Sequence, residues 1–133
     1  MNCKNDAVRD FVVNVLGCRC PEEVFRDIRL NRSPTPVGDV PLLFDIRVGG
    51  RLLVWGVAAG ELSGRATSMA ALAAAGARTR DDNGFNRFRL MAVTDEPAEM
   101  PELHRNFAEL AGLDDRMHLH IVEKRQLREL LVD

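Results

Sequence analysis

The chain has 133 residues, a length that fits one globular domain with an ordinary hydrophobic core. Apolar residues make up 46% and charged residues 29% of the sequence, which excludes an intrinsically disordered chain. The formal net charge of −2 argues against general affinity for nucleic acid or for an anionic membrane. No apolar run is typical of a signal peptide or a membrane span, and three cysteines cannot all pair within one chain. We therefore expect a cytoplasmic protein with a single domain over residues 1–133, whose cysteines are reduced thiols or metal ligands rather than a disulfide framework.

The N-terminal part of the sequence predicts two helices and a loop. Apolar residues with helical spacing predict a helix over residues 7–16, and Gly17 follows as a stop. Pro21, with two glutamates behind it, opens a shorter helix whose buried side includes Ile28. The prolines and glycine of residues 31–39 predict an exposed loop.

Gly49-Gly50 is a two-residue hairpin signal between apolar runs at 42–48 and 51–57. A two-residue turn pairs Val48 with Arg51 and sets the register of both strands. In that register six side chains share one buried face: Phe44, Ile46, Val48, Leu53, Trp55 and Val57. The opposite face, which includes Asp45 and Arg47, is expected to be partly solvated.

The rest of the chain alternates helices and strands. The expected elements are helices over 66–77, 101–111 and 123–131, strands over 87–94 and 117–122, and a turn at 81–84. A strand–helix–strand–helix–strand order favours right-handed crossovers and parallel strand pairs. The fold class expected is α/β: a mixed sheet with a β-hairpin followed by right-handed βαβαβ crossovers, and helices covering the sheet.

The helix over 66–77 is rich in alanine, so it can approach another surface closely. Together with a last strand that has one open edge, this predicts a homodimer contact. The alternative is that the alanines pack only on the protein's own sheet.

Cys18-Arg19-Cys20-Pro21 places two thiols at the expected start of the second helix, where helix-end amides favour thiolates. His118 and His120 alternate on the last strand and point to one side of it. Cys18, Cys20, His118 and His120 would together form a Cys2His2 set for zinc or iron. The alternatives are a thiol-redox pair without the histidines, or two inert side chains at a helix junction.

The segment Leu16-Gly17-Cys18-Arg19-Cys20-Pro21-Glu22-Glu23-Val24-Phe25 resembles part of an uncharacterised family of small prokaryotic proteins. Gly84-Phe85-Asn86-Arg87-Phe88, with the strand that follows it, is similar to a second segment of that family. The two segments cover about a fifth of the chain. The resemblance carries no activity over to it.

A second candidate site joins a strand to the alanine-rich helix. It combines hydroxyl groups, a glycine and an arginine at Ser63, Gly64, Arg65, Thr67 and Ser68. Helix N-termini of this composition bind phosphate through their amide groups, although the spacing is not that of a P-loop. The alternative is a capped strand-to-helix turn with no ligand.

The order of elements also resembles the restriction-endonuclease-like core. That resemblance implies a carboxylate on the second strand and a Glu-x-Lys on the third, which together hold a metal ion. Asp45 matches the first, but residues 52–56 read Leu-Leu-Val-Trp-Gly and lack the second. A relative of that family would therefore be a degenerate nucleic-acid binder without catalytic residues.

No catalytic triad or other paired-carboxylate motif is evident, so we lean away from an enzyme and name no catalytic residue. Arginines 78, 80, 87 and 89 surround a turn with two aspartates, which predicts a salt-bridged surface or a rim for an acidic partner. The function expected is a small soluble binding or regulatory domain, without membrane or nucleic-acid partners. The alternatives are a metal or thiol protein and the degenerate nuclease-like binder.

Overall fold

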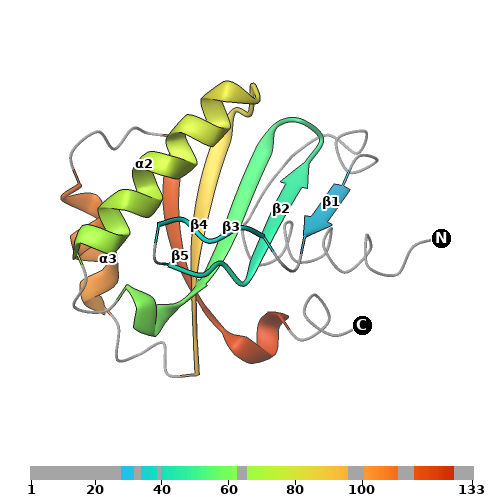
Figure 1. Ribbon diagram of the computed structural model, residues 1–133. Coiled ribbons are helices and arrows are strands. Elements are labelled where there is room, and N and C mark those ends of the chain that lie inside the picture. The colour runs from blue at the N-terminus through green and yellow to red at the C-terminus, as the bar shows by residue number, and fades with distance from the viewer. Residues whose placement is uncertain are drawn as a thin grey trace.

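The computed structural model describes residues 28–31, 34–38, 40–62, 66–95, 101–110 and 116–127. They form one five-stranded sheet with helices packed on it (Figure 1). The strands are β1 (Ile28–Asn31), β2 (Phe44–Val48), β3 (Leu52–Ala58), β4 (Arg87–Thr94) and β5 (Met117–Glu123). The helices are α2 (Ala66–Asp82) and α3 (Pro101–Ala108), with short 3-10 turns η2 (Ala59–Glu61) and η4 (Lys124–Leu127).

The strands lie in the order β1-β2-β3-β4-β5. The first three form an antiparallel meander, and β3, β4 and β5 are parallel to one another. Helix α2 links β3 to β4, and α3 links β4 to β5. This confirms the predicted α/β class and its mixed sheet; the handedness of the crossovers stays a prediction.

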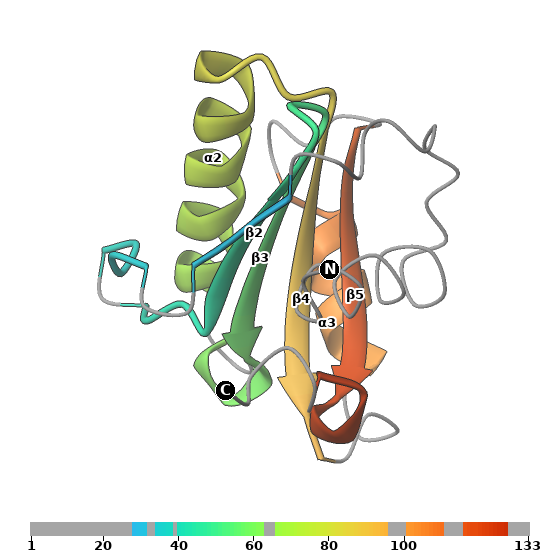
Figure 2. The same ribbon diagram turned by 90° about the vertical axis from the view of Figure 1, so that its right-hand side faces the viewer.

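Both helices lie on one face of the sheet, over β3, β4 and β5 (Figure 2). The core beneath them is close-packed around Phe88. The Phe88 ring meets Trp55 edge-on, with ring centroids 5.2 Å apart. Its other side lies against Gly76 of α2, where a Cβ would overlap the ring. Gly76 therefore serves contact with the protein's own sheet. The choice between the two interpretations of the alanines stays open, since Ala70, Ala71 and Ala74 are exposed.

The opposite face of the sheet is buried and apolar around β2, β3 and the middle of β4. Phe44, Ile46, Val54 and Met91 are fully inaccessible there. Phe44 is opposite Gly56 in the register, and a Cβ on that glycine would overlap the phenylalanine ring. Central strands with two buried faces read as nearly continuous apolar runs, which is the pattern of Leu52 to Val57.

The predicted hairpin register is wrong by one residue. Val48 is opposite Leu52, not Arg51, so three residues instead of two separate the paired strands. The Arg51 carbonyl instead accepts hydrogen bonds from the amides of Asn86 and Arg87, at 2.8 and 3.0 Å. A one-residue slip turns every side chain of a strand to the other face. Leu53, Trp55 and Val57 therefore share a face with Asp45 and Arg47, and not with Phe44, Ile46 and Val48.

Several other boundaries differ from the prediction, among them the end of α3, which is Ala108 and not residue 111. Ile28, expected on a helix, begins β1, which pairs with β2. Helix α2 runs on to Asp82, five residues past the predicted end. Strand β5 is followed by the 3-10 turn η4 where a helix was expected from Glu123.

The predicted helices over 7–16 and after Pro21 lie outside the described residues, apart from Ile28. Within the described part of the chain, no helix has the length and apolar character needed to cross a membrane. The homodimer contact stays a prediction.

Candidate anion-binding site

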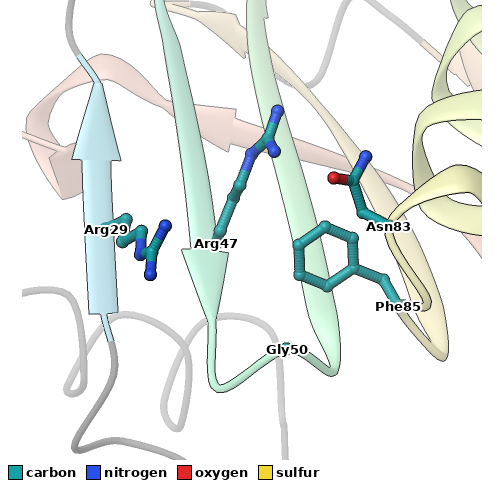
Figure 3. Close-up of a pocket in the computed structure, with 5 residues that line it drawn as sticks. All are labelled: Arg29, Arg47, Gly50, Asn83 and Phe85. Carbon is teal, nitrogen blue, oxygen red and sulfur yellow. The ribbon is translucent and has the colours of Figure 1, made fainter.

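Two arginines lie side by side near the β1 edge of the sheet. Arg29 of β1 and Arg47 of β2 are direct partners in the antiparallel register. Direct partners point to the same face of a sheet. Arg47 is also opposite Leu53, so this is the face that carries the helices. The main contacts of α2 and α3 are with β3, β4 and β5, which leaves the two guanidinium groups outside the helix-covered area (Figure 3).

Asp45 fixes the position of Arg47. The Asp45 carboxylate accepts from Arg47 Nε at 3.1 Å and from Nη2 at 3.2 Å. The same carboxylate accepts from Trp55 Nε1 at 3.1 Å. Asp45 is only 8% exposed, whereas the Arg47 side chain is 36% exposed. The buried Asp45 carboxylate therefore has hydrogen-bond donors for both of its oxygens. Its two hydrogen bonds from Arg47 restrain the plane of that guanidinium group.

Phe85 bounds the arginine pair on the side of α2. The Arg47 guanidinium carbon lies 5.8 Å from the centre of the Phe85 ring, within the range of a cation–π contact. Gly84, with φ of +74°, turns the chain at the end of α2. The Phe85 amide then donates to the Arg80 carbonyl at 2.8 Å, which ties the loop to the helix.

Two shallow hollows lie against the arginine pair, and both are lined by Arg29 and Arg47. The first has a volume of about 210 Å³ and the second about 270 Å³. The first is completed by Gly50, Asn83 and Phe85 (Figure 3). The second is completed by Leu30, Asn31 and Asp45. We refer to the two hollows together as the arginine site.

The predicted histidine pair lies elsewhere, on the opposite face of the sheet. His118 and His120 are half-buried on β5, in register with Arg89 and Met91 of β4. Arg89 Nη1 donates to His120 Nε2 at 2.8 Å. Burial, followed by the charges of Arg89, His118 and His104, lowers the pKa of His120 to about 4. His120 is therefore neutral near pH 7, and its Nε2 is occupied as an acceptor.

The structure does not test the proposed metal or thiol site, because Cys18 and Cys20 lie outside the described residues. Among the residues that are described, no three His, Cys, Asp or Glu side chains are grouped so as to hold a metal ion. The positive charge of Arg89 beside His120 also opposes a cation at that nitrogen. The Cys2His2 set for zinc or iron stays a prediction.

The predicted anion site at the start of α2 is described only in part. Ser63, Gly64 and Arg65 lie outside the described residues. Thr67 is exposed and Ser68 is half-buried on the first turn of the helix. This segment follows the carboxyl end of β3, whereas the arginine site lies near its amino end, so the two are separate places in the fold.

Asp45 does not occupy a nuclease-like metal site within the described part of the chain. Directly opposite Asp45 on β3 stands Trp55, which donates to it. Both carboxylate oxygens accept hydrogen bonds from protein side chains, with Arg47 as the only charged neighbour whose contact is resolved here. Asp45 thus acts as an anchor for an arginine.

Sequence reasoning missed the arginine pair, because the pair exists only when β1 and β2 are joined. One signal was available in Ile28-Arg29-Leu30-Asn31, which alternates apolar and polar residues as a half-buried strand does. Comparisons with models of known protein families, with characterised proteins and with solved structures find no match to this chain.

Proposed function

We propose that the protein is a binding domain that holds an anionic group, a phosphate or a carboxylate, in the arginine site. The observation that carries this proposal is the side-by-side placement of Arg29 and Arg47 on neighbouring strands. An anion placed between two guanidinium groups is bound by N–H donors from both of their planar forks.

The dimensions of the site favour a small group. Pockets that enclose a drug-sized ligand have volumes of about 300–1,000 Å³. The two hollows, at about 210 and 270 Å³, are each below that range. They suit a single phosphate or carboxylate, or one such group at the end of a larger molecule.

Preorganisation supports the same function. Arg47 donates its Nε hydrogen and one Nη2 hydrogen to Asp45. The remaining Nη hydrogens can therefore bind a ligand while both hydrogen bonds to Asp45 are kept. A side chain that is already held loses less conformational entropy when its ligand binds. The Trp55–Asp45 hydrogen bond links this held arginine to the hydrophobic core.

The proposal is tested with inorganic phosphate as the probe. A ligand that binds only the folded state raises stability by RT ln(1 + [L]/Kd), so the thermal midpoint should rise as phosphate is added at constant ionic strength. Arg29→Gln should abolish this rise and leave the fold intact, because Arg29 is exposed. Arg105→Gln, an exposed arginine on α3, is the matched control and should behave as the parent protein does.

Two results would count against the proposal. One is a phosphate-dependent rise that survives in Arg29→Gln. The other is no rise with phosphate and none with acetate at the same ionic strength.

A further inference from the structure

Arginines mark one whole end of the sheet. At the end of the sheet where Val48, Leu52 and Arg87 are in register, each strand has an arginine at its last paired position or one residue from it. On β1 and β2 these are the two residues of the arginine site. On the three parallel strands they stand at or just before the first residue: Arg51 before β3, Arg87 at the start of β4 and Arg116 before β5. We call Arg29, Arg47, Arg51, Arg87 and Arg116 together the arginine row.

Backbone contacts place the members of the row next to one another. The Arg51 carbonyl accepts from the Arg87 amide at 3.0 Å. The Arg116 carbonyl accepts from the Phe88 amide, also at 3.0 Å, so Arg116 adjoins the start of β4. Since neighbouring strands are about 4.8 Å apart, four gaps give the row a length of about 19 Å.

The row follows the end of the sheet and is not confined to one face. Arg29 and Arg47 point to the helix side. Arg116 Nη2 lies 4.0 Å from Asp81 Oδ1, on the last turn of α2, so its head group is also on that side. Arg87 is in register with Leu52 on the opposite face, but it is exposed at the first position of its strand. Arg51, in the hairpin turn, is exposed as well.

We infer that the row binds the phosphate backbone of a single nucleic-acid strand, with the arginine site holding one of its phosphates. This inference rests on the proposed function and names the class of its ligand. A single small anion cannot contact groups spread over about 19 Å, whereas one nucleic-acid strand presents a phosphate at every nucleotide along such a line. The row takes one arginine from each strand or from the residue just before it, which makes one line that matches one backbone. The second arginine of β4, Arg89, instead donates to His120.

The residue type also favours phosphate. All five cations are arginine, whose planar fork binds phosphate oxygens in pairs. An arginine has five N–H donors, so Arg47 and Arg116 can each keep a protein carboxylate and still reach a phosphate. Phe85, the aromatic side chain of the site, is buried and offers no exposed ring for base stacking. The contacts of the row are with phosphates, which are the same at every nucleotide, so the binding should show little base preference.

The overall charge of −2 predicts no general affinity for nucleic acid, and the row does not contradict it. Local charge decides such contacts, because salt screens charges more than about 10 Å apart. We therefore expect weak binding at physiological salt and marked binding at low salt.

The test is fluorescence anisotropy of a labelled twelve-residue oligothymidylate at several salt concentrations. For single strands, log K falls with log[salt] with a slope of about −0.7 per neutralised phosphate. Five contacts predict a loss of about 100-fold in affinity between 50 and 200 mM salt. The double variant Arg51→Gln/Arg87→Gln should lose only about 20-fold over that interval, because two contacts are gone. Arg105→Gln/Arg125→Gln, two exposed arginines outside the row, is the matched control and should keep the parent slope.

Several outcomes separate the two proposals. If phosphate binding depends on Arg29 but the Arg51→Gln/Arg87→Gln slope equals that of the parent, the row is refuted and the arginine site stands. If the slope changes as expected but inorganic phosphate does not bind, the proposed function fails as stated. A polyglutamate of equal charge that binds as tightly as the oligonucleotide would overturn the nucleic-acid inference in favour of an acidic protein partner.

Discussion

The helix side of the sheet has two halves, one on β3, β4 and β5 and the other on β1 and β2, which differ in what covers them. Over β3, β4 and β5 the helices cover an apolar layer in which Trp55, Phe88 and Gly76 touch. Over β1 and β2 the same face carries two arginines and an aspartate. The Trp55–Asp45 hydrogen bond is the link between the halves. The covered half contributes stability through buried apolar contacts, and the polar half is the place where we propose that a ligand binds.

Trp55→Ala should have the largest effect, because it damages both halves. It removes the edge-on contact with Phe88 and leaves Asp45 without its indole donor. Truncating a buried aromatic residue costs about 3–5 kcal/mol. Denaturant unfolding should show a midpoint lowered accordingly.

Trp55→Phe separates the two contributions. It keeps a ring against Phe88 and loses only the hydrogen bond, so the cost should fall to about 1–3 kcal/mol. Equal midpoints for the parent and Trp55→Ala would contradict the burial of this side chain.

Gly76→Ala should damage the covered half alone. The added Cβ overlaps the Phe88 ring, which Trp55 confines from another side. Overpacking of this kind costs about 1–3 kcal/mol, partly offset by the better helix propensity of alanine. Phosphate binding should be unchanged at temperatures where the variant is folded.

Gly60→Ala is the control for the glycine series, because a Cβ there meets nothing within 4 Å. It should leave the unfolding midpoint close to that of the parent. A Gly76→Ala protein as stable as Gly60→Ala would show that α2 lies farther from the sheet than described.

The sequence predicts those features of the two halves that depend on neighbouring residues, and it does not predict those that depend on how strands pair. The strand over 87–94 and the mixed sheet were predictable, because apolar spacing and turn residues are local signals. The register of the hairpin was not, since every residue from Leu52 to Trp55 is apolar and both faces of β3 are buried. Periodicity cannot choose between two equally buried faces.

The candidate site was harder to predict than the fold. Arg29 and Arg47 become neighbours only through the pairing of β1 with β2, a contact between residues far apart in the chain. The Asp45–Trp55 bond likewise requires the observed register. The residues selected from motifs, His118 and His120, do lie on one side of β5 as predicted, but beside Arg89.

Stability measured at several pH values tests the protonation of His120, which lies on the face of the sheet opposite the helices. The pKa of His120 is lowered to about 4 in the folded state, below its ordinary value of 6.5. The unfolded state therefore binds this proton first as pH falls, so stability should be lost between about pH 6.5 and 4 and be independent of His120 above that range.

His120→Gln should reduce the loss of stability over this acid range, as measured by urea unfolding at several pH values. His104→Gln, an exposed position on α3, should change the profile much less. Identical profiles for the parent and His120→Gln would contradict a half-buried histidine that is neutral near pH 7.

Arg29→Gln should have the smallest effect on stability, within about 0.5 kcal/mol, because it is an exposed position. Its effect should appear in ligand binding alone. A large loss of stability in this variant would show that Arg29 serves the fold, and the two halves of the face would then not differ in role.

The most direct test of the arginine site uses Trp55, the one tryptophan in the chain, as its reporter. Its indole N–H is bonded to Asp45, which in turn holds Arg47. In a phosphate titration at constant ionic strength, the indole N–H resonance should shift and reach saturation in the parent and in Arg105→Gln. The shift should be absent in Arg29→Gln. A resonance that does not move in the parent, or that moves equally in Arg29→Gln, would contradict the account.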